Sequence, residues 1–209
     1  MNTKAILEKL NIMVPEPKFE LVVSSPFELI VALILSAQCT DKRVNEVTSV
    51  MFKKFNKPEH YASMMQEQLE EMIKPCGFYR NKAKNIISMS RDLISKFNGS
   101  IPKTMEELTT LAGVGRKTAN VILAEVYNIP AIAVDTHVFK VTNRLGMKTK
   151  NVEECEQKLM EAFDKKDWSR LHLQLVLHGR YTCMAPHPHC ERCLLTDECE
   201  FYITNTLKK

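Results

Sequence analysis

The chain has 209 residues, of which 44% are hydrophobic and 26% are charged, and its formal net charge is +4. This composition is typical of a globular protein with one large domain or two small ones, and it permits a nucleic-acid partner without requiring one. The longest apolar run, Leu29 to Leu35, is too short to span a bilayer, and the first residues lack the apolar stretch of a secretory signal. We therefore expect a cytoplasmic protein that does not bind membranes.

Signals for helix starts recur along the whole chain. A capping residue is followed three positions later by Glu or Gln at Ser25, Ser63, Thr104 and Asn151. The segment from Phe27 to Ala37 is apolar nearly all round, which predicts a central buried helix. Strand-like alternation is scarce. The sequence therefore predicts an all-α fold of about ten helices with short connections.

Residues 108–119 read LTTLAGVGRKTA and predict a turn between two helices. The first helix is expected to end near Leu111 and the second to begin near Arg116. Gly113 and Gly115 permit positive φ angles and leave backbone amides uncovered, and such amides beside a helix N-terminus can bind a phosphate. A tight helix–helix connection without a ligand would produce the same pattern.

Lys117 and Asp135 are the chemically notable residues that follow this turn. Lys117 falls in the first turn of the second helix, where the macrodipole disfavours a cation, so a structural role explains it poorly. The same field and the neighbouring Arg116 favour a neutral, nucleophilic amine, although exposed lysines are common. Asp135 precedes a predicted helix, where aspartate is a good N-cap. A capped carboxylate stays ionised and could also face Lys117.

Four of the seven cysteines lie within seventeen residues: Cys183, Cys190, Cys193 and Cys199. In a reducing compartment such a group indicates metal or cluster ligation rather than disulfides. The spacing C-x6-C-x2-C-x5-C does not choose between zinc and iron, since it fits neither a zinc ribbon nor the ferredoxin pattern. We favour a [4Fe-4S] cluster. The other three cysteines are interpreted as inert.

Together these motifs resemble those of one family. LAGVGRKTA, then VDTH with its aspartate eighteen residues after Lys117, then HGRYTC and the four cysteines are similar to the endonuclease III family of helix-hairpin-helix DNA glycosylases. The likeness also covers SSPFELIVALILSAQCTD and GFYRNKAKNI. It runs over essentially the whole chain, and the combination is highly specific.

The resemblance implies a two-lobed all-α protein, the helix-hairpin-helix glycosylase fold. A six-helix barrel would span residues 23–131 and contain the hairpin at about 104–127. The second lobe would join residues 1–22 to 132–209 and hold the [4Fe-4S] cluster in the loop 183–199. Damaged double-stranded DNA would be the partner, and we expect a monomer because no second apolar face is evident.

The resemblance further implies a bifunctional DNA glycosylase and AP lyase that removes oxidised pyrimidines. Lys117 would attack C1′ of the flipped nucleotide to form a Schiff base, and β-elimination would nick the strand 3′ to the lesion. Asp135 would help deprotonate the amine and stabilise the positive charge on the sugar.

DNA contacts are implied for seven more residues: Gln38, Phe78, Gly113, Val114, Gly115, Arg116 and His137. Gln38 would fill the gap left by the flipped base, and Phe78 would stack into the duplex as an apolar wedge. The alternatives are a polar loop residue and an ordinary core aromatic. The basic side chains around Phe78 predict phosphate contacts: Lys74, Arg80, Lys82 and Lys84.

Two departures from the family pattern concern DNA binding. Ala112 stands where the hairpin usually has proline, and the loop after Cys183 reads MAPHPH where lysine and arginine are usual, so we expect that loop to contribute less. The rival functions are a monofunctional glycosylase, a non-catalytic iron–sulfur DNA-binding protein and an electron carrier. The first would lack a lysine at position 117, and the second would not need Lys117 and Asp135 together.

Overall fold

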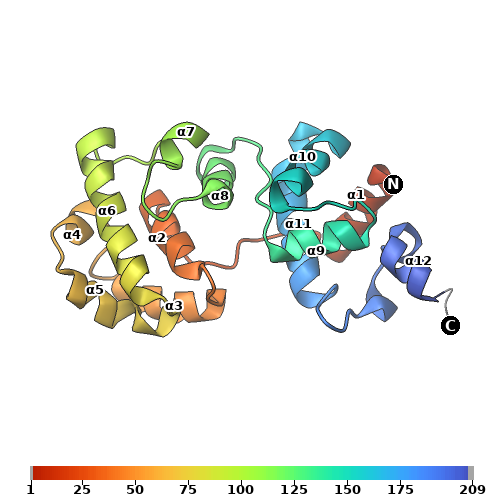
Figure 1. The fold of residues 1–209 in the computed structure, drawn as a ribbon, viewed down its shortest axis with the longest axis horizontal. Helices are drawn as coiled ribbons and strands as arrows, with labels where there is room; N and C mark the ends of the chain where they lie inside the picture. The colour runs from red at the N-terminus through yellow and green to blue at the C-terminus, as the bar shows by residue number, and fades with distance from the viewer. Residues whose placement is uncertain (1, 207–209) are drawn as a thin grey trace. The chain divides into compact units, whose positions relative to one another are not determined.

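The computed structural model describes residues 2–206, which form helices and irregular segments without a strand (Figure 1). Twelve α-helices and four 3-10 helices occur in this range, more than the ten or so predicted, because several have only four to seven residues. The predicted all-α fold is confirmed. None of the helices described is long and apolar enough to cross a membrane. The described residues divide into two compact units, 19–128, and 2–18 with 129–206.

The unit of residues 19–128 is built around α2, which buries every side chain from Phe27 to Leu35 and contacts α3, α6 and α8 (Figure 1). The prediction of a central buried helix is confirmed. Its elements are α2 (Pro26–Ser36), α3 (Asp41–Met51), α4 (Pro58–Ala62), α5 (Gln66–Ile73), the 3-10 helix η1 (Lys74–Cys76), α6 (Tyr79–Phe97), α7 (Met105–Leu108) and α8 (Arg116–Tyr127).

Local capping explains where several helices begin. The side chains of Ser25, Thr104 and Asn151 accept hydrogen bonds from the amide three residues later, as predicted. The prediction for Ser63 is wrong. The N-cap of α5 makes no side-chain hydrogen bond, and the hydroxyl of Ser63 instead donates to the carbonyl of Glu59 at 3.0 Å, at the end of the short helix α4.

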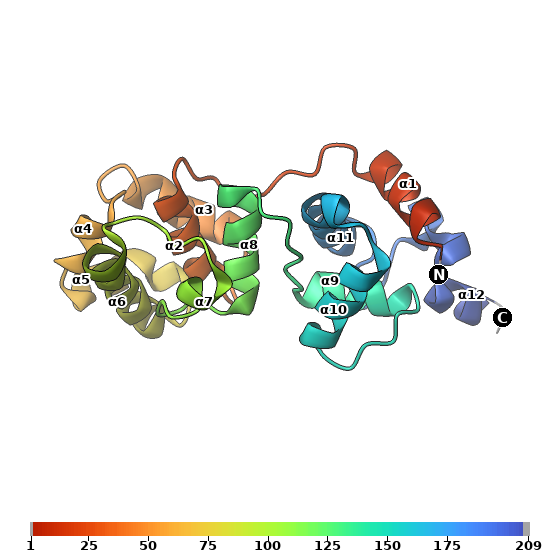
Figure 2. The same cartoon turned by 90° about the horizontal axis from the view of Figure 1, so that it is seen from above.

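The second unit joins the N-terminal helix to the C-terminal half of the chain. Figure 2 shows α1, in red, within the same unit as the blue C-terminal segment. Ile6 and Leu10 of α1 are fully buried with apolar side chains of α9, α10 and α11, and Lys9 makes an ion pair of 2.7 Å with Glu198. The elements are α1 (Thr3–Met13), α9 (Thr136–Arg144), α10 (Val152–Ala162), η2 (Lys165–Asp167), α11 (Trp168–Tyr181), η3 (Cys190–Arg192), η4 (Thr196–Glu198) and α12 (Glu200–Thr206).

Candidate functional site

Residues 109–115 form the turn between α7 and α8. The first helix ends at Leu108, three residues earlier than predicted, whereas α8 begins at Arg116 as predicted. Leu111 and Val114 are buried and anchor the turn to the core. Because the side chain of Val114 is only 5% exposed, any contact that this residue makes with DNA must use its backbone.

The two glycines of the turn differ in what they require. Gly113 has φ +80°, and a Cβ atom there would lie 3.0 Å from the Cβ of Asn85 on α6, so any other residue would be strained and crowded. Gly115 is the N-cap of α8, with φ −91°, and a Cβ atom added to it would meet nothing within 4 Å. No side chain caps α8, so its first amides lie beside an exposed glycine. Such a helix start is suited to binding an anion.

Alanine substitutions at Gly113 and at Gly115 test whether only the first position requires glycine. Gly113→Ala should destabilise the protein by about 1–3 kcal/mol, because alanine is strained at positive φ and would crowd Asn85. Gly115→Ala meets neither obstacle, and because alanine is a poorer N-cap than glycine, its free energy of unfolding should fall by no more than about 1 kcal/mol. Urea unfolding of both variants measures the effect. Equal stabilities would mean that the turn can rearrange at Gly113.

Lys117 is exposed and is the second residue of α8. The first turn of this helix contains no acidic residue that would offset its charge. The macrodipole therefore disfavours the positive charge of Lys117, and no carboxylate in the same turn offsets this effect. The position predicted for Lys117 is confirmed, and its role as a nucleophile stays a prediction.

Asp135 is the N-cap of α9, as the sequence predicts. Its Oδ1 accepts hydrogen bonds from the amides of His137, at 2.9 Å, and Val138, at 2.8 Å. Because both amides donate to Oδ1, Oδ2 is not needed to cap the helix. The half-buried carboxylate can therefore cap the helix and serve chemistry at the same time.

His137 packs closely against α11 at Gly179, the glycine of the HGRYTC motif. A Cβ atom on Gly179 would lie 2.8 Å from the Cβ of His137 and 3.2 Å from its Cα, so the glycine lets α9 and α11 approach closely. The Nδ1 atom of His137 is buried and has no hydrogen-bond partner among the described residues.

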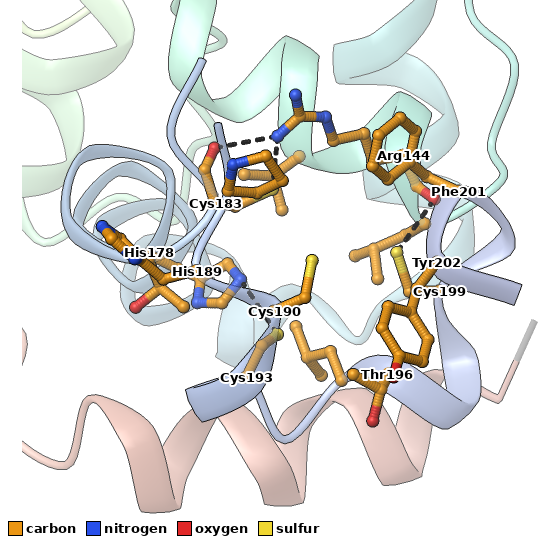
Figure 3. A pocket seen from close by; sticks show the side chains of 15 residues that line it. Arg144, His178, Cys183, His189, Cys190, Cys193, Thr196, Cys199, Phe201 and Tyr202 are labelled. Carbon is orange, nitrogen blue, oxygen red and sulfur yellow. Dashed lines mark hydrogen bonds between the residues drawn. The ribbon is translucent and has the colours of Figure 1, made fainter. Parts of the chain in front are cut away.

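The four C-terminal cysteines line one cavity (Figure 3). The structure brings together Cys183 after α11, Cys190 at the start of η3, Cys193 after η3 and Cys199 after η4. About 380 Å³ of space outside the protein atoms lies among these residues, part of it open to solvent. Most of the surface that lines this cavity belongs to apolar atoms. Among the residues described, no three His, Cys, Asp or Glu side chains form a group that could hold a single metal ion.

Two residues that sequence reasoning missed hold the cysteine segment (Figure 3). Arg144 donates to the Sγ and carbonyl of Cys183, each at 3.2 Å, and accepts at its own carbonyl from the thiol of Cys199 at 3.3 Å. His178 places Nε2 at 3.7 Å from the Sγ of Cys193. His178 is the first residue of the HGRYTC motif, but its contact with Cys193, like the contacts of Arg144, is seen only in the folded arrangement.

Burial of the cysteines disfavours their charged thiolate forms. Burial raises the pKa of Cys193 to about 11 and raises the pKa values of Cys190 and Cys199 as well. Thiolates here therefore need a bound cation to compensate their charge. Four converging thiols in a largely apolar cavity fit an iron–sulfur cluster.

Gln38 and Phe78 occupy two exposed turns of the 19–128 unit. Both have left-handed backbone conformations that are rare for residues other than glycine, with φ +52° for Gln38 and +47° for Phe78. The side chain of Phe78 is 65% exposed, so the alternative of an ordinary core aromatic is wrong. An exposed ring on a strained turn is available to a partner.

The prediction of a basic surface around Phe78 is wrong for one of its four residues, Lys82. Lys74, Arg80 and Lys84 are exposed, as phosphate contact would need, but Lys82 is only 5% exposed. A signal for this burial was present in the sequence, because Lys82 precedes Ile86 by one helical turn and so falls on the apolar face of α6.

Comparisons with known proteins agree with the motifs. Residues 31–165 match the family described as HhH-GPD superfamily base excision DNA repair protein. The chain is 47% identical to endonuclease III of Bacillus subtilis, with 95% of this chain and 93% of that protein covered, and 44% identical to that of Escherichia coli K12, with 94% and 93% covered.

A solved structure of a trapped endonuclease III–DNA covalent intermediate is 42% identical to this chain and superposes with a TM-score of 0.93. The match covers 99% of both chains. A thermostable thymine-DNA glycosylase shares only 19% identity but has the same fold, with a TM-score of 0.88. The chain therefore belongs to the endonuclease III family of helix-hairpin-helix base excision DNA repair proteins.

Proposed function

We propose that this chain is a bifunctional DNA glycosylase and AP lyase that acts on oxidised pyrimidines in damaged double-stranded DNA. Membership of the endonuclease III family supports the activity, as does the likeness to endonuclease III trapped covalently on DNA. The position of Lys117 carries the proposal. It is an exposed amine in the first turn of α8, a helix whose N-cap, Gly115, makes no side-chain hydrogen bond.

Binding would begin with the DNA backbone. The amides at the start of α8, together with Gly113, Gly115 and Arg116, would hold a phosphate near the lesion. Phe78 would stack into the duplex, and Gln38 would occupy the gap left by the extruded nucleotide. Extrusion costs a few kcal/mol, which these contacts would offset.

The chemistry would then take place on the extruded nucleotide. The neutral amine of Lys117 would attack C1′ of the sugar, and the glycosidic bond would break with its electron pair leaving on the base. Asp135 would accept a proton from the amine and stabilise the positive charge that develops on the sugar. The C1′–O4′ bond of the resulting aminal would then break, with O4′ taking up a proton, which opens the sugar ring and gives the Schiff base. Loss of a C2′ proton from the Schiff base would expel the 3′ phosphate by β-elimination.

The four cysteines would hold a [4Fe-4S] cluster. When bound, the cluster would supply four iron–thiolate bonds that fix the segment from Cys183 to Cys199. Arg144 and His178 would orient the sulfurs that they contact. Iron and sulfide analysis of the purified protein distinguishes this group from zinc, which would bring no sulfide.

The proposal keeps the predicted organisation around this activity. Residues 23–131 would form the six-helix barrel that carries the hairpin, and residues 1–22 with 132–209 would form the cluster domain. The protein would act as a monomer in the cytoplasm. Sedimentation equilibrium tests the monomer, since a concentration-dependent mass would contradict it.

Borohydride trapping tests the function directly. The purified protein is incubated with duplex DNA that contains one thymine glycol, and the imine is reduced with borohydride. A covalent adduct on a denaturing gel is the expected result, because only a Schiff base is reduced to a stable amine. Tight binding without an adduct would support a DNA-binding protein, and base release without an adduct would support a monofunctional glycosylase.

Asp135→Asn separates the two roles proposed for this carboxylate. The amide oxygen can still accept the two backbone hydrogen bonds that cap α9, so stability should stay within about 1 kcal/mol of the wild type. Loss of the negative charge should slow adduct formation by about a hundredfold or more. Single-turnover trapping and thermal unfolding measure the two effects. Unchanged trapping rates would remove Asp135 from the reaction.

A further inference from the structure

Lys82 of α6 places a buried ammonium group between two turns of the 19–128 unit. Its Nζ donates to the carbonyl of Leu35, in the last turn of α2, and to the carbonyl of Cys76, at the end of η1. Both distances are 2.8 Å. The side chain is 5% exposed, so these bonds form away from solvent. One cation therefore ties together segments that lie 41 residues apart in the sequence.

A cation is well suited to this position. The last carbonyls of a helix lack partners within the helix and lie at the negative end of its macrodipole, and α2 has no basic residue in its own last turn. Lys82 supplies that charge from another helix. Burial lowers the pKa of Lys82, while the nearby thiols of Cys39 and Cys76 act in the opposite direction. Burying a lysine is costly, so the two charge-assisted hydrogen bonds must hold their acceptors firmly.

The two segments that Lys82 holds lead directly into the exposed turns described above. Gln38 is three residues beyond Leu35, and Phe78 is two residues beyond Cys76. Both residues have positive φ angles, which persist only where the surrounding structure imposes them. A fixed carbonyl at the start of each turn is such a constraint.

We propose that Lys82 is a positioning residue that sets the Gln38 turn and the Phe78 turn relative to each other, so that both side chains enter DNA as one unit. This inference rests on the proposed function, because it concerns how that function distorts the duplex. Lys82 itself would not touch DNA. Its effect would be seen only in steps that need the duplex to be opened.

Lys82→Met tests the proposal, because methionine keeps the length of the side chain but donates no hydrogen bond. A fluorescent base analogue placed opposite a thymine glycol reports unstacking, and single-turnover assays report excision. Both should fall by a factor on the order of ten to a hundred with duplex DNA. Borohydride trapping on an abasic site in single-stranded DNA should stay within about twofold of the wild type, since no duplex has to be opened.

Three comparisons make the outcome decisive. Lys96→Met removes the same charge from an exposed position of α6 and should leave every readout unchanged. In a Phe78→Ala background, Lys82→Met should lower duplex excision by no more than about threefold, because the turn that it positions has already lost its ring. A full loss in that background, or an equal loss on single-stranded DNA, would overturn the proposal. If the wild type forms no adduct on either DNA, the proposed function fails instead.

A second variant covers the case in which Lys82→Met does not fold. Lys82→Arg keeps the charge but presents its donors as a planar fork, which cannot reproduce the two bonds of a single ammonium group. Circular dichroism should show a folded protein. Duplex excision should fall while trapping on single-stranded abasic DNA remains. Retention of full duplex excision and full unstacking by this variant would contradict the positioning role.

Discussion

Lys117→Ala is expected to form no borohydride-stabilised adduct with thymine glycol DNA and to nick that DNA at a rate lower by a factor on the order of a thousand or more. The amine is the only group proposed to form a bond to the sugar, so its removal eliminates the covalent step. Binding to the same DNA should weaken far less, because the proposed phosphate contacts of the turn before α8 use its backbone and do not need the Lys117 side chain.

Stability separates this loss from a folding defect. Lys117 is exposed in the first helical turn, where the macrodipole disfavours its charge, so alanine should leave the free energy of unfolding unchanged or slightly higher. Lys96→Ala, on an exposed part of α6, is the control and should retain the adduct. An adduct that persists in Lys117→Ala would show that another amine is the nucleophile.

Cys193→Ser should prevent binding of the proposed iron–sulfur cluster and loosen the C-terminal segment. Cys193 is one of the four thiols that line the shared cavity, and a serine hydroxyl is a much poorer ligand for iron. Iron content should fall by at least about half, and protease cleavage within residues 183–206 should become faster because metal ligation and local folding are coupled. Iron analysis and limited proteolysis with mass spectrometry measure both effects.

Cys155→Ala is the matched control for this experiment. Cys155 is also buried in the same unit, on α10, but it does not line the cavity. Its replacement should lower stability through a small packing defect and leave the iron content unchanged. Loss of iron in both variants would mean that general destabilisation, not ligation, releases the metal.

Patterns that depend on near neighbours in the chain predicted much of this structure. Ser25, Thr104 and Asn151 cap helices because the acceptor and the amide are only three residues apart. The same rule failed at Ser63, whose hydroxyl donates instead to the carbonyl of Glu59 in the short helix α4. The capping pattern at Ser63 was as good as at the other three positions, but the hydrogen bond to α4 replaced the one that would have capped α5.

Contacts between distant segments could not be predicted in the same way. Lys82 was interpreted as part of a basic surface because it lies among other cations, yet its partner Leu35 is 47 residues away. Arg144 is tied to Cys183 across 39 residues, and nothing in the order of residues marks that pair. The four cysteines were found because their spacing is short, whereas the residues that support them depend on helix packing.

The connectivity of the two units has a consequence for synthesis on the ribosome. Residues 19–128 are contiguous and can acquire all their internal contacts as soon as that stretch has emerged. Helix α1 is made before them, but Ile6 and Leu10 are buried against α11, and Lys9 pairs with Glu198, which is made well after residue 128. Helix α1 is thus made before residues 19–128 but can pack only after α11 has been made, so its apolar face stays in solvent or bound to a chaperone while the residues between are translated.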